Sequence, residues 1–154
     1  MKKAIIMFVL LLFAGPVMAD ATIKIGGNLG TDQVNSFMLS VQPESCGTCL
    51  SPYFVRLSTD QGKYDGIGVD LKHEFLKREQ DTFTLSFGPV SFREGLNNSS
   101  RLQFHASLGF EIKSTENSAV VLSYDVYDPF KYALDRDVQD TRTVHTVNVG
   151  LRFK

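Results

Sequence analysis

Three residue types that occur together in hydrolytic sites lie within one short segment of the chain. His105, Ser107 and Glu111 all stand at odd positions of RLQFHASLGFEIK, residues 101–113. A histidine base, a serine nucleophile and a carboxylate are the components of a catalytic triad. In an extended chain Glu111 would lie about 20 Å from His105, too far to orient the imidazole. His105 and Ser107 are therefore candidates for base and nucleophile, and the alternative is that they belong to the polar lining of the domain.

The segment that carries these candidates alternates between apolar and polar side chains throughout. Because side chains of a strand alternate between its two faces, the pattern predicts a β-strand with one apolar and one polar face. Strands of globular domains typically have about 5–6 residues, so this strand is unusually long. The apolar face comprises Leu102, Phe104, Ala106, Leu108, Phe110 and Ile112, and the polar face comprises Arg101, Gln103, His105, Ser107, Gly109, Glu111 and Lys113.

Strand-like segments recur along the chain, whereas helical periodicity is nearly absent. The links between the segments are rich in Gly, Asn, Asp and Ser, which is typical of turns. The pattern predicts eight strands, near residues 22–29, 35–43, 51–58, 64–75, 81–92, 101–113, 118–128 and 143–153.

Alternation alone does not say which face meets water. A soluble barrel buries its apolar face, whereas an outer-membrane barrel turns that face to lipid and encloses the polar one. Strands of 11–13 residues suit a tilted membrane crossing, and the polar faces can fill a narrow eight-stranded interior. An even strand number also places both termini on the same side of the membrane. We therefore predict an all-β, eight-stranded antiparallel up-and-down barrel in the bacterial outer membrane, with a soluble periplasmic ligand-binding barrel as the alternative.

The first nineteen residues have the pattern of an export signal. Lys2 and Lys3 precede an apolar run that is too short to span a bilayer as a helix. Val17-Met18-Ala19 then provides a cleavage site for signal peptidase. Residues 1–19 are thus predicted to be a signal peptide, and residues 20–154 a single barrel domain that is monomeric.

The charge balance and the cysteines narrow the choice of partners. With 16 Lys and Arg against 17 Asp and Glu, the chain lacks the basic excess that nucleic-acid binding requires. Cys46 and Cys49 predict a disulfide in a turn, because an exported chain meets an oxidising compartment. A redox motif or half of a zinc site are alternatives. The acidic group Asp135, Asp137 and Asp140 lacks the pattern of an EF-hand loop, so we expect no metal and no cofactor.

The stretch from about Phe83 to Phe153 resembles the C-terminal half of the lipid A 3-O-deacylases, the PagL-like acyloxyacyl hydrolases. The resemblance lies in RLQFHASLGFEI, AVVLSYDVYD and the closing VNVGLRF. It implies an outer-membrane barrel of eight strands. The family carries His-x-Ser-Asn in its penultimate strand, where this chain reads SYDVYD, residues 123–128. His105-Ala106-Ser107 keeps His-x-Ser one strand earlier, and Leu108 follows in place of Asn.

Two functions from different classes follow from the sequence. The first is a barrel without the family's catalytic motif, with a structural role or an interaction with outer-membrane lipid, for which lipopolysaccharide is the candidate partner. The second is a divergent lipid A ester hydrolase with His105 as base and Ser107 as nucleophile. The sequence alone leaves open whether the protein is an enzyme.

Overall fold

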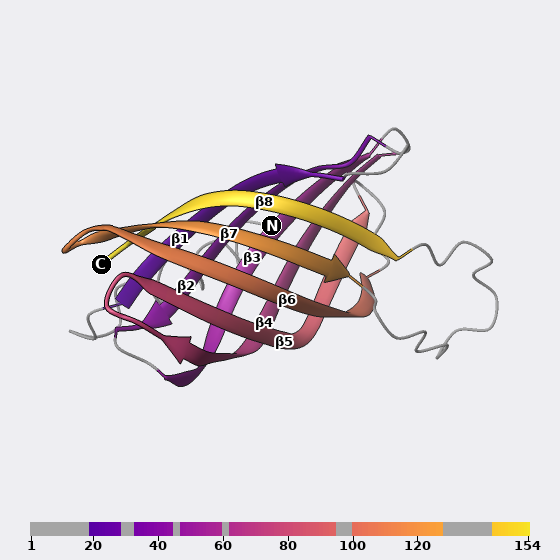
Figure 1. The fold of residues 1–154 in the computed structure, drawn as a ribbon. Coiled ribbons are helices and arrows are strands. Elements are labelled where there is room, and N and C mark those ends of the chain that lie inside the picture. The colour runs from indigo at the N-terminus through magenta and orange to yellow at the C-terminus, as the bar shows by residue number, and fades with distance from the viewer. Residues whose placement is uncertain (1–18, 29–32, 45–46, 60–61, 95–99, 128–142) are drawn as a thin grey trace.

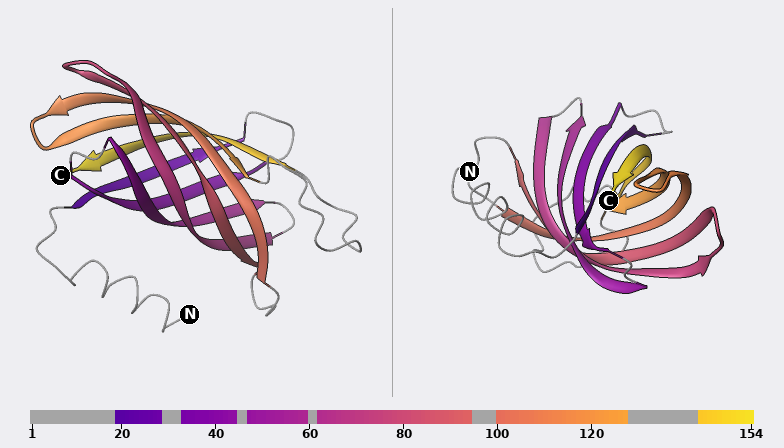
Figure 2. Two further views of the ribbon diagram at one scale, coloured as in Figure 1. Left: turned by 90° about the horizontal axis from the view of Figure 1, so that it is seen from below. Right: turned by 90° about the vertical axis from the view of Figure 1, so that its left-hand side faces the viewer.

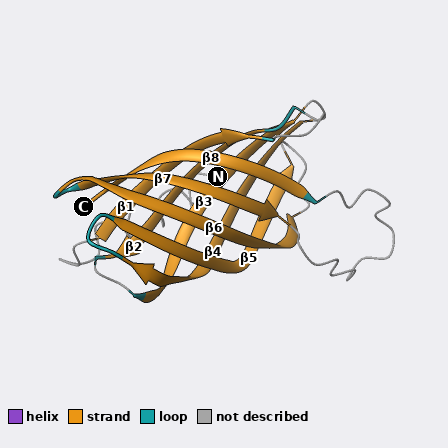
Figure 3. Cartoon of the chain, viewed as in Figure 1, coloured by secondary structure: helices purple, strands orange, loops and turns teal. Residues whose placement is uncertain are grey.

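The protein is a closed barrel of eight antiparallel strands (Figure 1). The computed structural model describes residues 19–28, 33–44, 47–59, 62–94, 100–127 and 143–154. Every regular element in these ranges is a strand (Figure 3). The strands are β1 (Ala19–Gly27), β2 (Asn35–Pro43), β3 (Thr48–Thr59), β4 (Gly62–Lys77), β5 (Asp81–Glu94), β6 (Ser100–Thr115), β7 (Ser118–Tyr127) and β8 (Val144–Phe153).

Each strand pairs with the next one in the chain, and β1 pairs with β8 to close the sheet. The predicted fold class, strand number and strand order are thereby confirmed. The strand bounds agree with the prediction to within three residues, the largest differences being the earlier starts of β1 and β3. No helix among the described residues is long and apolar enough to cross a membrane.

The barrel has two distinct ends (Figure 2). β1 begins and β8 finishes at the same end, which we call the terminal end; it also carries the links β2–β3, β4–β5 and β6–β7. The opposite end, the loop end, carries the links β1–β2, β3–β4, β5–β6 and β7–β8. Every odd-numbered strand therefore runs from the terminal end to the loop end.

Burial in this barrel is reversed relative to a soluble protein. Leu102 is 71 % exposed and Ile25 is 64 % exposed, whereas Asp125 is fully buried. This confirms the prediction that the apolar faces of the long strands point outward and the charged faces point inward. The other large apolar residues of the exposed face include Ile23, Phe37, Leu50, Ile67, Val69, Leu71, Phe75, Leu85, Phe87, Leu108, Ile112, Leu122, Val149, Leu151 and Phe153.

The interior is not polar along its whole length. At the loop end it is filled by an apolar cluster, which we call the apolar plug. Glycines on β4 provide the room for it: a Cβ atom on Gly68 would lie 2.4 Å from the Tyr53 ring, and one on Gly66 would lie 2.7 Å from Phe92. The apolar plug consists of Val34, Met38, Tyr53, Val55, Leu57, Val90, Phe92 and Tyr127, with Tyr64 and Val144 packed against it.

Candidate functional site: the charged interior

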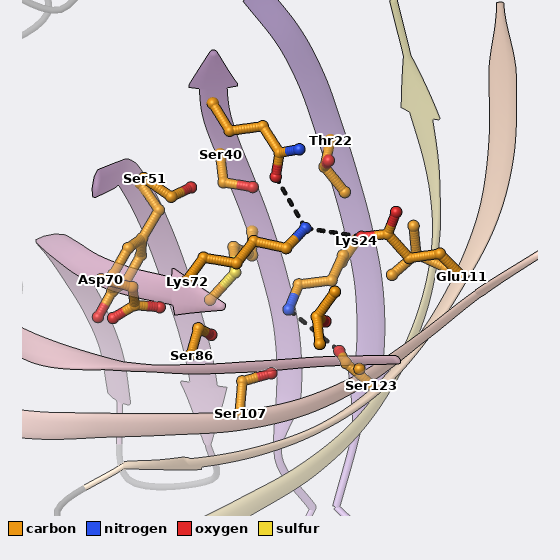
Figure 4. A pocket seen from close by; sticks show the side chains of 16 residues that line it. Thr22, Lys24, Ser40, Ser51, Asp70, Lys72, Ser86, Ser107, Glu111 and Ser123 are labelled. Carbon is orange, nitrogen blue, oxygen red and sulfur yellow. Dashed lines mark hydrogen bonds and ion pairs between the residues drawn. The ribbon is translucent and has the colours of Figure 1, made fainter. Parts of the chain in front are cut away.

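The polar part of the interior surrounds a small cavity (Figure 4), and Met38 and Tyr53 of the apolar plug also line it. Its volume is about 40 Å³, and the seven strands β1 to β7 contribute polar side chains to its lining. One enclosed water molecule needs on the order of 10–15 Å³ by this kind of measure. The cavity therefore has room for a few water molecules and none for an acyl chain or a sugar. Its labelled lining residues are Thr22, Lys24, Ser40, Ser51, Asp70, Lys72, Ser86, Ser107, Glu111 and Ser123.

His105 is held between two carboxylates from neighbouring parts of the wall. Its Nδ1 atom lies 2.8 Å from Asp70 Oδ2, and its Nε2 atom lies 3.2 Å from Asp125 Oδ1. With both carboxylates ionised, both ring nitrogens donate and the ring is an imidazolium. The ring also stacks on Tyr127 with centroids 4.8 Å apart and contacts Tyr53 at 5.1 Å. His105 therefore lies where the apolar plug meets the polar interior.

Asp125 is the centre of this first cluster. Lys24 Nζ on β1 lies 2.9 Å from Asp125 Oδ1, and Ser123 Oγ donates to Asp125 Oδ2 at 2.6 Å. Asn148 on β8 donates its amide to the same carboxylate. A buried carboxylate needs such partners to offset the loss of water around its charge. Asp125 thus connects β1, β6, β7 and β8 across the interior.

A second ion-paired cluster lies nearer the terminal end. Lys72 Nζ lies 2.6 Å from Glu111 Oε1 and 2.7 Å from Gln42 Oε1. Arg152 on β8 donates its Nε–H to Asp20 Oδ2 on β1 at 2.9 Å, and its Nη1 donates to Glu111. This second cluster joins β1, β2, β4, β6 and β8. Because β1 and β8 are the strands that close the barrel, the Arg152–Asp20 pair spans the closing seam.

The two clusters cross-link the wall of the barrel through its interior. Within each cluster the charged side chains form ion pairs. Such a pair offsets the free-energy cost of burying charge only when both partners are present. Within the described ranges, no group of three or more His, Cys, Asp and Glu side chains could hold a metal ion. The apolar plug closes the loop end of the interior, and the clusters fill the remainder around the small cavity.

The structure places His105 and Ser107 on the same inward face, with both side chains buried. Both nitrogens of His105 are bonded to carboxylates, and Glu111 bonds Lys72 and Arg152 instead of the imidazole. The predicted catalytic role of His105 and Ser107 stays a prediction. The sequence did not predict Asp70 and Asp125 as partners of the histidine. The alternation of its strand indicated that Asp70 points inward. It did not indicate the register between strands that brings Asp70 near His105 on β6.

Several predictions fall outside the described residues. Cys46 is not among the described residues, so the Cys46–Cys49 disulfide stays a prediction. The acidic group Asp135, Asp137 and Asp140 and residues 1–18 of the expected signal peptide are also outside.

Comparison with solved structures supports the fold. The chain is similar to Neisserial surface protein A (NspA), with a TM-score of 0.60 and 16 % identity over 88 % of this chain and 94 % of that one. A de novo designed transmembrane β-barrel gives a TM-score of 0.56 with 12 % identity, covering 90 % and 96 % of the two chains. The N-terminal β-barrel domain of Pseudomonas aeruginosa OprF gives 0.56 with 12 % identity, covering 87 % and 96 %.

Comparison at the sequence level finds no match. No protein-family model matches the chain, and no curated protein matches it. The comparisons therefore support the barrel fold that the resemblance to lipid A 3-O-deacylases implied. They do not support membership of that family.

Proposed function

We propose that the protein is a small, non-conducting barrel of the bacterial outer membrane that contacts the outer leaflet with its loop end facing outside. Its role is structural: the barrel anchors its outward-facing segments at the cell surface. The observation that carries the proposal is the reversed burial, with apolar side chains outside and paired charges inside. A soluble barrel with this exterior would expose far more contiguous apolar surface than monomeric proteins usually tolerate.

The dimensions of the apolar band support insertion in a bilayer. On β6 the outward apolar residues run from Leu102 to Ile112. Ten residue steps at about 3.3 Å each give roughly 33 Å along the strand. At a strand tilt of about 35–45°, this corresponds to roughly 25 Å along the barrel axis, the usual height of the apolar band in outer-membrane barrels. The closed ring of backbone hydrogen bonds also leaves no sheet edge open to lipid.

The contents of the interior support a barrel that does not conduct. Eight strands enclose only enough room for side chains or one small ligand. Here Tyr53 and Tyr127 pack above His105, and the ion pairs of Lys24 and Lys72 cross the space below. An ion would have to break several buried pairs to pass, and each broken pair leaves an uncompensated charge.

Cell fractionation and gel mobility test the location. The protein should be recovered in the outer-membrane fraction, and an unheated sample should migrate differently from a boiled one on a denaturing gel. Recovery in the soluble periplasmic fraction would contradict the proposal and favour the soluble-barrel alternative.

Planar bilayers test the closed interior. The folded protein should produce no discrete current steps under conditions in which a porin control does. Discrete steps from the pure protein would contradict a non-conducting role.

The hydrolase alternative has its own measurement. Lipid A from cells with and without the protein should have the same acyl chains in a mass spectrum, and Ser107→Ala should change nothing. Loss of an acyl chain that depends on Ser107 would replace the structural role by an ester hydrolase.

A further inference from the structure

Three charged side chains form a row on the outer surface near the loop end. In the register of the sheet Arg56 on β3 is the partner of Asp65 on β4, and Asp65 is the partner of Arg93 on β5. All three side chains have the outward parity of their strands. Arg56 and Asp65 form a bidentate pair with N–O distances of 2.6 and 3.0 Å, and both remain accessible, at 47 % and 32 %.

Among the described residues, cations outnumber carboxylates along this row. Lys63, two residues from Asp65 toward the loop end, is exposed and has the same outward parity. Together the four side chains contribute three positive charges and one negative charge. Among the described residues of the terminal end, exposed charges of both signs occur. These include Arg78, Lys113 and Lys154 as well as Glu44, Glu79 and Glu116.

The row begins where the apolar exterior ends on its own strands. The outward positions before it are Phe54 on β3 and Ile67 on β4, while on β5 Pro89 and Ser91 separate Phe87 from the row. Beyond them the exterior becomes polar while the interior becomes apolar, because Val55, Leu57, Val90 and Phe92 of the apolar plug lie on the inner side of the same strand segments. In an inserted barrel this change of exterior marks the level at which acyl chains give way to headgroups.

We propose that Arg56, Arg93 and Lys63 form a binding site for the phosphate groups of a phosphorylated glycolipid in the outer leaflet. The planar guanidinium fork of arginine binds a phosphate through two parallel hydrogen bonds, and lysine adds a point charge. Asp65 pairs with Arg56 and lowers the charge of the site when no lipid is bound. The inference deepens the proposed function and rests on it, because the loop end must face the outer leaflet.

Lipid binding to the purified full barrel in neutral detergent tests this site. Native mass spectrometry should detect a complex with bis-phosphorylated lipid A and a complex at least about tenfold weaker with the same lipid after removal of both phosphates. The double variant R56Q/R93Q should lose about tenfold in affinity for the phosphorylated lipid. Equal binding of the two lipids, or an unchanged affinity of R56Q/R93Q, would overturn the site.

Two further variants separate binding from a purely structural role of the row. Asp65→Asn removes the carboxylate that competes for Arg56, so the affinity for phosphorylated lipid A should rise; a fall would overturn the proposal. The matched control R78Q/K113Q removes two exposed cations at the terminal end and should bind as the wild type does. If this control lost affinity as R56Q/R93Q does, the binding would depend on overall charge, and the proposed site would be wrong.

The source of the phosphate is tested in the same assay. Millimolar inorganic phosphate should not displace the lipid, and displacement would indicate a site for free anions instead of a lipid headgroup. Insertion of every variant into phosphatidylcholine vesicles is checked first by the mobility of unheated samples. Failure of the wild type to insert would contradict the proposed membrane location itself, which is a different result from insertion without lipid A binding.

Discussion

At the level of single residues, His105 connects two buried carboxylates with the aromatic side chains of the apolar plug. His105→Phe would keep a ring between Tyr127 and Tyr53 but would remove both hydrogen bonds to Asp70 and Asp125. Breaking a buried pair while its partner charge remains typically costs about 3–5 kcal/mol. We expect the free energy of unfolding of the variant to fall by roughly this amount, measured by urea titration in lipid vesicles.

His145→Phe is the matched control for this prediction. His145 lies on the outer face, where its Nδ1 atom and the Tyr124 hydroxyl are 2.7 Å apart. Loss of this exposed contact should change stability by less than about 1 kcal/mol. Equal losses in the two variants would mean that the buried carboxylates do not depend on His105.

Gly68 is a second residue with a specific role, since its missing side chain leaves the space that the Tyr53 ring fills. A Cβ atom there would lie 2.4 Å from Tyr53 Cζ, with Tyr53 itself almost fully buried. Overpacking of this kind typically costs about 1–3 kcal/mol, so Gly68→Ala should destabilise the barrel by that amount in the same urea titration. Gly47→Ala is the control, because nothing lies within 4 Å of a Cβ atom at Gly47. A Gly68→Ala variant as stable as this control would contradict the tight fit of the apolar plug.

At the level of strands, the sequence was enough to predict all eight elements and the outward direction of the long apolar faces. Each depends on local alternation: Phe83, Leu85 and Phe87 share one parity on β5, and the structure exposes that face. The apolar plug was not predicted, because the face of β5 that carries the apolar side chains changes along the strand. Val90 and Phe92 have the inward parity of Thr84, so the apolar residues move from the outer to the inner face without any break in alternation.

The charged clusters were unpredictable for a different reason. A single strand shows which side chains share a face, but the partners of His105 come from β4 and β7, 35 and 20 residues away. Such pairs depend on the register between strands and on how the wall curves around the interior. Local patterning carries no information on either.

The outer face of β6 gives a prediction for the strand as a whole. Leu108 lies within the outward apolar row and is 52 % exposed. Arginine at the middle of the lipid-facing band typically costs about 2–4 kcal/mol, whereas an exposed arginine on a soluble protein costs little. Leu108→Arg should therefore lower stability in vesicles by this amount, while Ser114→Arg, exposed beyond the apolar row on the same strand, should change it by less than about 1 kcal/mol. Similar small effects of both substitutions would favour a soluble barrel.

At the level of the whole molecule, the barrel consists of two parts with opposite polarity. Toward the terminal end the exterior is apolar and the interior charged, as in a membrane barrel. Toward the loop end, β3 to β5 have a polar exterior around the apolar plug, as in a soluble barrel. Both parts depend on one closed ring of strands, because an open seam would expose the charges of Asp20 and Lys24 to lipid.

Closure of that ring can be tested by a disulfide across the seam between β1 and β8. Ile23 and Leu151 are register partners, so their Cα atoms should lie about 4.5–5.5 Å apart, within disulfide range. After oxidation, I23C/L151C with Cys46 and Cys49 replaced by serine should form a crosslink that stabilises the barrel by on the order of 4–5 kcal/mol, because it closes most of the chain into a loop. In I23C/V149C the cysteines are diagonal, about 7–8 Å apart, and should remain reduced. Equal crosslinking of both pairs on a non-reducing gel, or of neither, would show that β1 and β8 do not close the barrel in this register.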